Sequence, residues 1–197
     1  MSVIVNPYVS KSNASVRISG AVKEPGFLPI TNGTTLEEII NKLEFIDVYP
    51  WLAVLEQFDD NNLIKSTILF NLKDPDTYSS VKVLPNSQIF FANINTRSFD
   101  VSSMSRNLIT DYDLRLTHKQ GTYNLPVFGR FEVKSFVEYL GLDMSDVEDK
   151  ATYISPLDSN IVVDSYKNMT FTAKKYHNIS FRSPVNDLIT VSISGAV

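Results

Sequence analysis

The sequence predicts an α+β fold made of two tandem modules, each a small mixed sheet with one packed helix. Three observations support this prediction: a heptapeptide that occurs twice, an order of strand, turn, strand and helix after its first copy, and a weaker second copy of that order. Residues 16–22 (VRISGAV) and 191–197 (VSISGAV) are identical at six of seven positions. Such repeats are typical of chains assembled from similar units. Because the second heptapeptide ends the 197-residue sequence, we expect it to be the first strand of a third, truncated module.

The first module is expected to begin with a hairpin. Apolar and polar residues alternate over 16–20, which is typical of a half-buried strand. Pro25 followed by Gly26 favours a type II turn, because proline fixes φ at the first central position and glycine accepts positive φ at the second. Leu28 and Ile30 then predict a short return strand.

A helix is predicted directly after this hairpin. Thr34 and Thr35 each precede a glutamate by three residues, so either pair can form a capping box at the helix start. An apolar stripe follows with the spacing of one helix face. The stripe consists of Leu36, Ile39, Ile40 and Leu43. Later apolar runs predict strands at 53–58, 64–72 and 89–92.

A second, divergent module is predicted from the same order of elements. Leu114 and Leu116 precede Gly121, and Tyr123 and Leu125 follow as a return strand. The apolar helix stripe then recurs at Val133, Phe136, Val137 and Leu140. Strands are expected at 152–154, 161–163 and 170–173, and a last strand is expected from Leu188 onward.

These elements predict four segments along the chain. Residues 1–14 are a lead-in, 15–100 form the first module, 101–188 form the second module, and 189–197 begin the third. A mixed sheet with a packed helix and a hairpin before it is the β-grasp arrangement. The expected fold is therefore α+β with tandem β-grasp modules.

The motif residues of the first module resemble the SLBB module, the soluble-ligand-binding β-grasp domain. Its pattern joins a V-x-G-x-V-x-x-P-G turn motif to a T-L-x-x-L-I helix start. The first module supplies both parts through Ile18, Gly20, Val22, Pro25, Gly26, Thr35, Leu36, Ile39 and Ile40. The second module keeps Gly121, Tyr123 and the helix stripe but has Gln120 in place of the proline. Residues 186–189 (NDLI) resemble the later G-D-x-I motif, from which the first module departs.

This resemblance implies a role in polysaccharide export. Tandem SLBB modules are similar to those of Wza-like outer-membrane proteins, where they stack as periplasmic rings of an oligomer. The chain would then be a periplasmic scaffold fragment of an outer-membrane-associated capsular or exopolysaccharide export protein, forming part of a translocation channel. The implied partners are further copies of the chain in a homo-oligomeric ring, the polysaccharide, and an inner-membrane export or copolymerase protein. Residues 1–7 lack the features of a signal peptide, so we expect the leader of an exported protein to lie outside this sequence.

A soluble-ligand-binding module without a channel role is the alternative, with a glycan or another small molecule as its ligand. SLBB modules also resemble units of cobalamin carriers, DNA-uptake proteins and a respiratory-complex subunit. A DNA-uptake role would be expected to bring a helix-hairpin-helix motif and a basic face. The net charge of −4 and the pI of about 5.2 do not provide the basic footprint of a nucleic-acid-binding protein, so we expect no nucleic-acid partner.

The sequence offers no convincing catalytic or metal-binding pattern. It contains no cysteine, no Gly-rich phosphate loop and no nucleophile elbow. His118 and His177 are the two histidines, and neither has metal-site spacing, so we expect polar surface or turn residues. Asp111 with Asp113 could be imagined as a glycosidase pair, but acids in turn clusters are normally solvated. We therefore expect a protein that is not an enzyme and that uses no cofactor or metal.

Aromatic residues are the candidates for glycan contact, because sugars stack on aromatic faces. The candidates are Tyr49, Trp51, Tyr123 and Tyr153. The alternative for each is a place in the core or in a cross-strand pair, as is common in small β modules. Trp51 follows Pro50, and because such sequences mark turns, we expect Trp51 to be the most exposed of the four.

Overall fold

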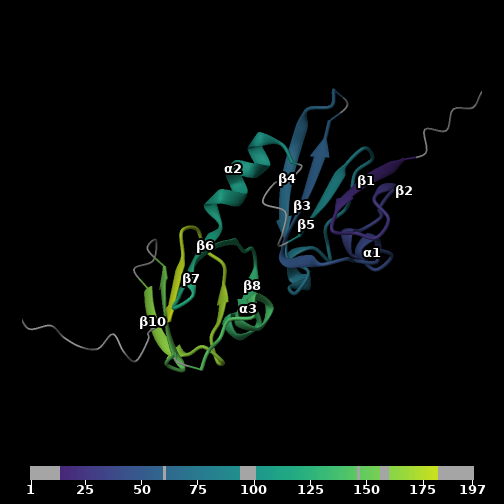
Figure 1. Ribbon diagram of the computed structural model, residues 1–197. Helices are drawn as coiled ribbons and strands as arrows, with labels where there is room; N and C mark the ends of the chain where they lie inside the picture. Colours follow the sequence, from purple (N-terminus) through teal and green to yellow (C-terminus); the bar gives the residue numbers. More distant parts are fainter. Residues whose placement is uncertain (1–13, 60, 94–100, 146, 156–159, 182–197) are drawn as a thin grey trace, which may run out of the picture.

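The computed structural model describes residues 14–59, 61–93, 101–145, 147–155 and 160–181. These residues form an α+β structure in which two five-stranded mixed sheets lie in two lobes, with a helix between them (Figure 1). The predicted α+β class is therefore confirmed.

The first lobe contains a sheet with the strand order β2-β1-β5-β3-β4. Strands β1 and β5 pair in parallel, whereas the other neighbours pair antiparallel. The elements are β1 (Ser15–Gly20), β2 (Gly26–Pro29), α1 (Leu36–Ile40), β3 (Val48–Phe58), β4 (Ile64–Phe70), the 3₁₀ helix η1 (Pro75–Thr77) and β5 (Gln88–Asn93). The strands predicted at 53–58, 64–72 and 89–92 are thus confirmed, with β3 beginning earlier than expected.

The second lobe contains a sheet with the order β10-β9-β12-β6-β7. The elements are α2 (Ser103–Asp111), β6 (Asp113–His118), β7 (Gly121–Pro126), β8 (Arg130–Glu132), α3 (Val133–Leu140), β9 (Lys150–Ser155), β10 (Asn160–Ser165), β11 (Thr170–Thr172) and β12 (Asn178–Phe181). The strands predicted at 152–154 and 161–163 are β9 and β10. The strand predicted at 170–173 is β11, which pairs with β8 outside the main sheet.

The two sheets have the same connectivity, because β7-β6-β12-β9-β10 in the second matches β2-β1-β5-β3-β4 in the first. The two sheets also share a backbone hydrogen bond at equivalent positions. The backbone N–H of Arg17 donates to the carbonyl of Ser87 over 2.9 Å, and that of Arg115 donates to the carbonyl of His177 over 3.0 Å. The strand that occupies the place of β5 in the second sheet is therefore β12, which is not predicted from the sequence. The strand predicted from Leu188 onward lies outside the described residues.

Three predicted segments lie wholly or almost wholly outside the described residues. The heptapeptide repeat at 191–197 and the NDLI segment at 186–189 belong to this part of the chain, as does nearly all of the lead-in at 1–14. The third module and the predicted module boundaries therefore stay predictions.

Helix α1 begins at the predicted cap. The Thr35 hydroxyl accepts a hydrogen bond from the Glu38 amide over 3.3 Å, which satisfies one of the free N–H groups at the helix start. Thr34 instead closes the preceding turn, where its hydroxyl accepts from the Thr31 amide. The helix buries Leu36, Ile39 and Ile40 against the sheet.

The loop between β1 and β2 is wider than the sequence predicts. Gly26 already pairs with Ile18 and has a φ of 154°, which does not fit the value near +80° of a type II turn. The predicted type II turn at Pro25 and Gly26 is therefore wrong. Gly20 has a φ of 89°, and a Cβ atom there would lie 2.0 Å from the Phe91 carbonyl oxygen. This close approach requires glycine.

Helix α2 is not predicted by the sequence analysis. It begins after Ser102, whose hydroxyl accepts a hydrogen bond from the Ser105 amide. Buried Glu56 of β3 accepts bonds from the Ser102 amide (2.9 Å) and the Ser105 hydroxyl (2.6 Å). A carboxylate at a helix start is stabilised by the partial positive charge there. Glu56 thus holds the first turn of α2 against the first sheet.

A single hydrophobic cluster joins the two lobes. It contains Trp51 and Tyr49 of the first sheet together with Phe136 of α3 and many apolar residues of the second sheet. The Trp51 ring stacks on the Phe136 ring with a centroid distance of 3.9 Å, and the Tyr139 ring meets the Trp51 edge at 5.0 Å. Residues 16, 18, 36 and 39 belong to a separate cluster around α1. The first sheet therefore packs on its own helix and on the second module as well.

Asn71 adds a polar clamp to this interface. Its buried side-chain amide donates to the carbonyls of Phe128 and Arg130, over 2.8 Å each, while its Oδ1 accepts from the Lys73 amide. Beside it, the Arg130 amide donates to the Asp74 carboxylate over 2.6 Å. These bonds fix the segment before β8 against the end of β4.

Replacing Asn71 with alanine is expected to lower the free energy of unfolding by about 2 kcal/mol, because two buried carbonyls lose their donor. Urea denaturation followed by circular dichroism measures this loss. Lys73→Ala is the matched control: Lys73 contributes only its backbone amide to this bond, so it should change stability by less than about 0.5 kcal/mol. Equal effects of the two substitutions would contradict the clamp.

Candidate functional site

Three of the four aromatic residues predicted to contact glycan are buried. Tyr49, Trp51 and Tyr153 are 3%, 2% and 2% exposed. The expectation that Trp51 is exposed is wrong, because one face of its ring is covered by Phe136 and its edge by Tyr139. Burial raises the pKa of Tyr49 well above its usual value. Tyr49 and Trp51 pack against the second module, Tyr153 packs within it, and the burial of all three rings leaves no open face for a sugar.

Tyr153 and Tyr123 both lie in the second lobe. Tyr153 stacks on Phe171 with a centroid distance of 3.8 Å. Tyr123 lies on β7, partly buried against the shared cluster, and keeps some exposure. Its contact with a glycan stays a prediction.

Both histidines are buried, so their predicted placement at the surface is wrong. His177 is fully buried and meets the rings of Phe131 and Tyr153 edge-on. Its ring nitrogens make no hydrogen bond of good geometry with the described residues. Burial lowers the pKa of His177 to about 4, although the nearby backbone of Tyr112 opposes part of the shift. His177 is thus a neutral core residue at pH 7.

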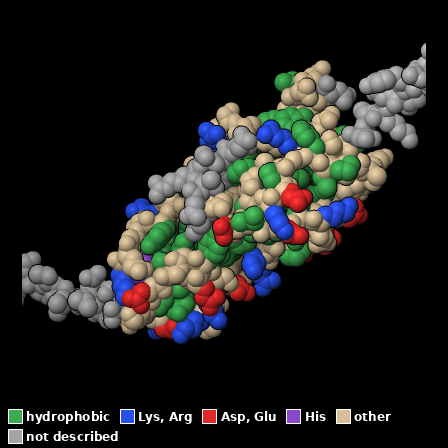
Figure 2. Space-filling model, turned by 45° about the vertical axis from the view of Figure 1, so that its right-hand side comes forward, with side chains coloured by type: hydrophobic (Ala, Val, Ile, Leu, Met, Phe, Trp, Pro, Cys, Tyr) green, Lys and Arg blue, Asp and Glu red, His purple; other side chains and the backbone are tan. Residues whose placement is uncertain are grey.

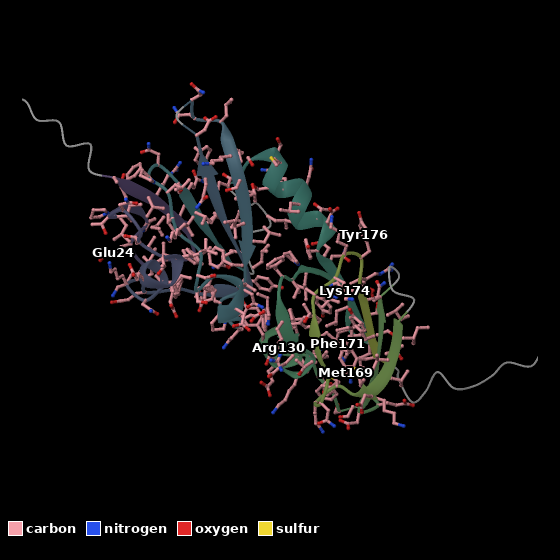
Figure 3. The ribbon with its side chains drawn as sticks, turned by 180° about the vertical axis from the view of Figure 1, so that it is seen from behind. Glu24, Arg130, Met169, Phe171, Lys174 and Tyr176 are labelled. Atoms are coloured by element: carbon pink, nitrogen blue, oxygen red, sulfur yellow. The ribbon has the colours of Figure 1, made fainter. Side chains whose placement is uncertain are left out.

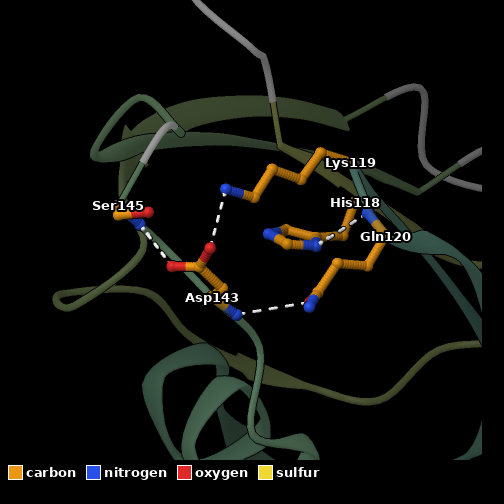
Figure 4. A network of polar contacts seen from close by, with 5 residues as sticks. All are labelled: His118, Lys119, Gln120, Asp143 and Ser145. Carbon is orange, nitrogen blue, oxygen red and sulfur yellow. Dashed lines mark hydrogen bonds and ion pairs between the residues drawn. The ribbon is translucent and has the colours of Figure 1, made fainter.

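A network of polar side chains surrounds His118 at the end of β6 (Figure 4). The His118 Nδ1 accepts from the Gln120 amide, and the Gln120 side chain accepts from the Asp143 amide. Lys119 forms an ion pair with Asp143 over 3.0 Å. Hydrogen bonds from Ser145 and Lys119 lower the pKa of the Asp143 carboxyl far below its usual value. This network ties the β6–β7 hairpin to the residues after α3, while the His118 Nε2 is buried without a hydrogen-bond partner among the described residues.

Asp111 and Asp113, the acidic residues considered as a glycosidase pair, have different surroundings. Asp111 receives bonds from Lys175 (2.6 Å) and Tyr176 (3.1 Å), which lower the pKa of its carboxyl. Burial raises the pKa of Asp113, two residues further on. Across the described ranges, no group of three or more His, Cys, Asp or Glu residues could hold a metal ion.

An open hollow of about 430 Å³ lies beside the β1–β2 loop. We call it the hairpin groove and define it by the residues that line it: Ile18, Val22, Lys23, Glu24, Pro25, Gly26, Phe27, Leu28, Lys42, Leu43 and Glu44. Glu24 marks its position at the end of the first lobe that lies far from Arg130, Phe171 and Tyr176 of the second (Figure 3). The volume is within the range of small-molecule sites.

Three contacts fasten one side of the groove. The Lys23 amide donates to the Glu44 carbonyl over 2.8 Å, and the Lys23 ammonium pairs with the Glu44 carboxylate over 2.7 Å. Val22 forms an isolated bridge with Phe45. These contacts fasten Val22 and Lys23, on one side of the β1–β2 loop, to the residues that follow α1. Pro25 and Phe27, on the other side of the loop, line the groove away from the end of α1.

The second module has the same fastening without the wide loop. The ion pair of Lys119 with Asp143 links the hairpin to the residues after the helix, as the pair of Lys23 with Glu44 does in the first module. However, His118 pairs directly with Gly121, so only two residues connect β6 to β7. The loop of the first hairpin is longer, because the last paired residues of β1 and β2 are Ile18 and Gly26. The two hairpins therefore differ in the length of the loop, and the hairpin groove lies beside the longer one.

The motif residues contribute to the site in different ways. Pro25 and Gly26 line the hairpin groove. Gly20 allows the backbone to pass the Phe91 carbonyl, and Gly121 begins β7. Thr35 and Leu36 begin α1. The sequence analysis missed Phe27 and Lys42, although the Pro-Gly motif indicated the loop that presents Phe27.

No family model matches the sequence, and no curated protein matches it. Among the described residues, no helix is both long and apolar enough to cross a membrane. Acidic and basic side chains are interspersed on the face drawn in Figure 2.

Proposed function

We propose that the chain is a non-catalytic scaffold and binding part of a polysaccharide export protein, built from two β-grasp modules of the SLBB type. In this proposal the modules form part of a homo-oligomeric channel in the periplasm, together with an inner-membrane export partner. The observation that supports it best is the shared connectivity of the two sheets. In each, a hairpin precedes the helix, and the first and last strands pair in parallel at the centre.

The interface between the modules fits a scaffold role. A channel wall must keep its shape while cargo moves past it, so flexible linkage between its modules would be a disadvantage. Trp51 packs on Phe136, and Asn71 bonds to the backbone before β8. Inter-domain motion is the default expectation unless an interface is large and apolar, and this interface is a continuous apolar cluster.

Sedimentation velocity of the chain over a wide range of concentrations tests the scaffold proposal. Rings of identical subunits use head-to-tail contacts that close, so the expected result is a discrete oligomer that grows at the expense of the monomer as concentration rises. Chemical crosslinking should then give a ladder that ends at a fixed number of subunits. A strict monomer under all conditions would contradict this function.

A ligand-binding module without a channel role is the second candidate, and the hairpin groove favours it. The groove has an exposed aromatic ring and charged side chains around an apolar floor. Titration of the chain with glycans and with cobalamin tests this alternative. Saturable binding by a protein that stays monomeric would support it over the channel.

A further inference from the structure

We propose that the hairpin groove is a subsite for one pyranose unit of an acidic glycan, held by Phe27, Lys42 and Glu24. This inference rests on the proposed binding function and assigns it a place and a ligand class. The ligand would carry a carboxylate, as a uronic acid does.

Phe27 provides the apolar platform. Its side chain is 76% exposed, the largest exposure of any large hydrophobic residue in the described part of the chain. It stands on β2 directly after Pro25 and Gly26 and borders the groove. The face of an aromatic ring carries partial negative charge, so it attracts the C–H bonds on one side of a pyranose ring. The pairing of β2 with β1 holds the backbone of Phe27 opposite Arg17.

Two charged side chains of the groove remain without an ion-pair partner among the described residues. Lys23 and Glu44 pair with each other, which leaves Lys42 on one side and Glu24 on the other. An ammonium group donates hydrogen bonds only, whereas a carboxylate accepts them only. Lys42 therefore fits a sugar carboxylate, and Glu24 fits vicinal hydroxyls. A uronate presents both groups on one ring, and charge-assisted bonds of this kind are the stronger ones.

The second module provides a contrast within the same chain. Its ammonium group, that of Lys119, is paired with Asp143, and the Gln120 side chain bonds to the Asp143 backbone. With two loop residues in place of the longer β1–β2 loop, the hairpin has no counterpart of the Pro25–Phe27 wall. Among the described residues, we therefore expect the acidic-glycan subsite in the first module and not in the second.

Titration of the full chain with a digalacturonate and with a neutral galactose disaccharide, followed by amide NMR shifts, tests this inference. The digalacturonate should bind saturably and weakly, with a Kd of roughly millimolar order because the site is open. The shifted amides should cluster at 22–28 and 42–44. The neutral disaccharide should bind several-fold more weakly.

Matched variants separate the contributions. Phe27→Ala should weaken binding of both disaccharides, whereas Lys42→Gln should weaken only the digalacturonate, by up to about fivefold, as expected for an exposed ion pair. Leu63→Ala removes a 65% exposed apolar side chain elsewhere, and Lys65→Gln removes an exposed lysine of β4. Both controls should leave binding unchanged.

Two results would overturn the inference. One is the absence of saturable shifts at the hairpin groove with either disaccharide. The other is equal affinity for both disaccharides together with no effect of Lys42→Gln. These results are separable from failure of the proposed function: a protein that forms rings without binding the glycan refutes the subsite alone, whereas a strict monomer that binds it refutes the channel.

Discussion

Replacing Trp51 with alanine is expected to lower the free energy of unfolding by about 4 kcal/mol, the upper part of the range for large-to-small substitutions in a core. The Trp51 side chain is 2% exposed, stacks on Phe136 and meets Tyr49 and Tyr139 edge-on. Its removal leaves a cavity at the junction of the two modules. Urea denaturation followed by far-ultraviolet circular dichroism measures the loss.

The position of Trp51 between the two modules leads to a second expected result. Because the cluster contains residues of both sheets, amide exchange should quicken in β5 and in β12 together. Trp51→Phe retains an aromatic ring against Phe136 and should cost clearly less than Trp51→Ala. A loss below about 1 kcal/mol for Trp51→Ala, or exchange that changes in one sheet alone, would show that the modules are independent.

The stability of the chain is expected to fall by about 3 kcal/mol between pH 6.5 and pH 4 because of His177. Its pKa is lowered from 6.5 to about 4 in the folded protein, so over this interval the unfolded chain binds a proton that the folded chain does not. Linkage then favours unfolding as the pH falls. The contribution is fully present above pH 6.5 and is lost progressively as the pH approaches 4. Each pKa difference of one unit corresponds to about 1.4 kcal/mol.

Comparison with His177→Phe isolates this effect. Phenylalanine retains a ring against Phe131 and Tyr153 but cannot titrate, so the difference between the two stability curves cancels the other groups. The carboxyls of Asp111, Asp143 and Asp149 have pKa values lowered below 3.8, so their contributions are lost mainly below this window. An unchanged slope between pH 6.5 and 4 in the variant would refute the role of His177.

The elements that the sequence predicts well are those defined by local chemistry. The Thr35 cap and the apolar stripe from Leu36 to Leu43 need only residues that are close in the chain. The structure contains the cap and a helix that buries Leu36, Ile39 and Ile40, but α1 ends at Ile40, so Leu43 lies outside the helix. Helix α2 depends instead on Glu56, whose carboxylate comes from a strand 46 residues before Ser102. Its own sequence buries only Ser105 and Ile109, so no apolar stripe indicates it. Tertiary contacts of this kind leave no local pattern.

The same distinction applies to the candidate site. Pro50 suggested a turn and hence an exposed Trp51, but Pro50 lies inside β3, where the pairing with β5 is irregular between Val48 and Ala53. Proline is tolerated at such irregularities because a ladder hydrogen bond is already missing there. The hairpin groove, in contrast, contains the Pro-Gly motif itself. Lys42 comes from the other wall, which only folding brings close.

The stacked rings of Trp51 and Phe136 have a mechanical consequence. A pulling force applied along the chain would reach the second module through this contact and the Asn71 bonds as well as through the covalent connection. The two lobes should therefore stretch and twist as one stiff body instead of bending at the connecting segment. In an array of such units, any bending would be concentrated at the joints between pairs of modules, and the spacing of these joints would set how far the assembly can curve.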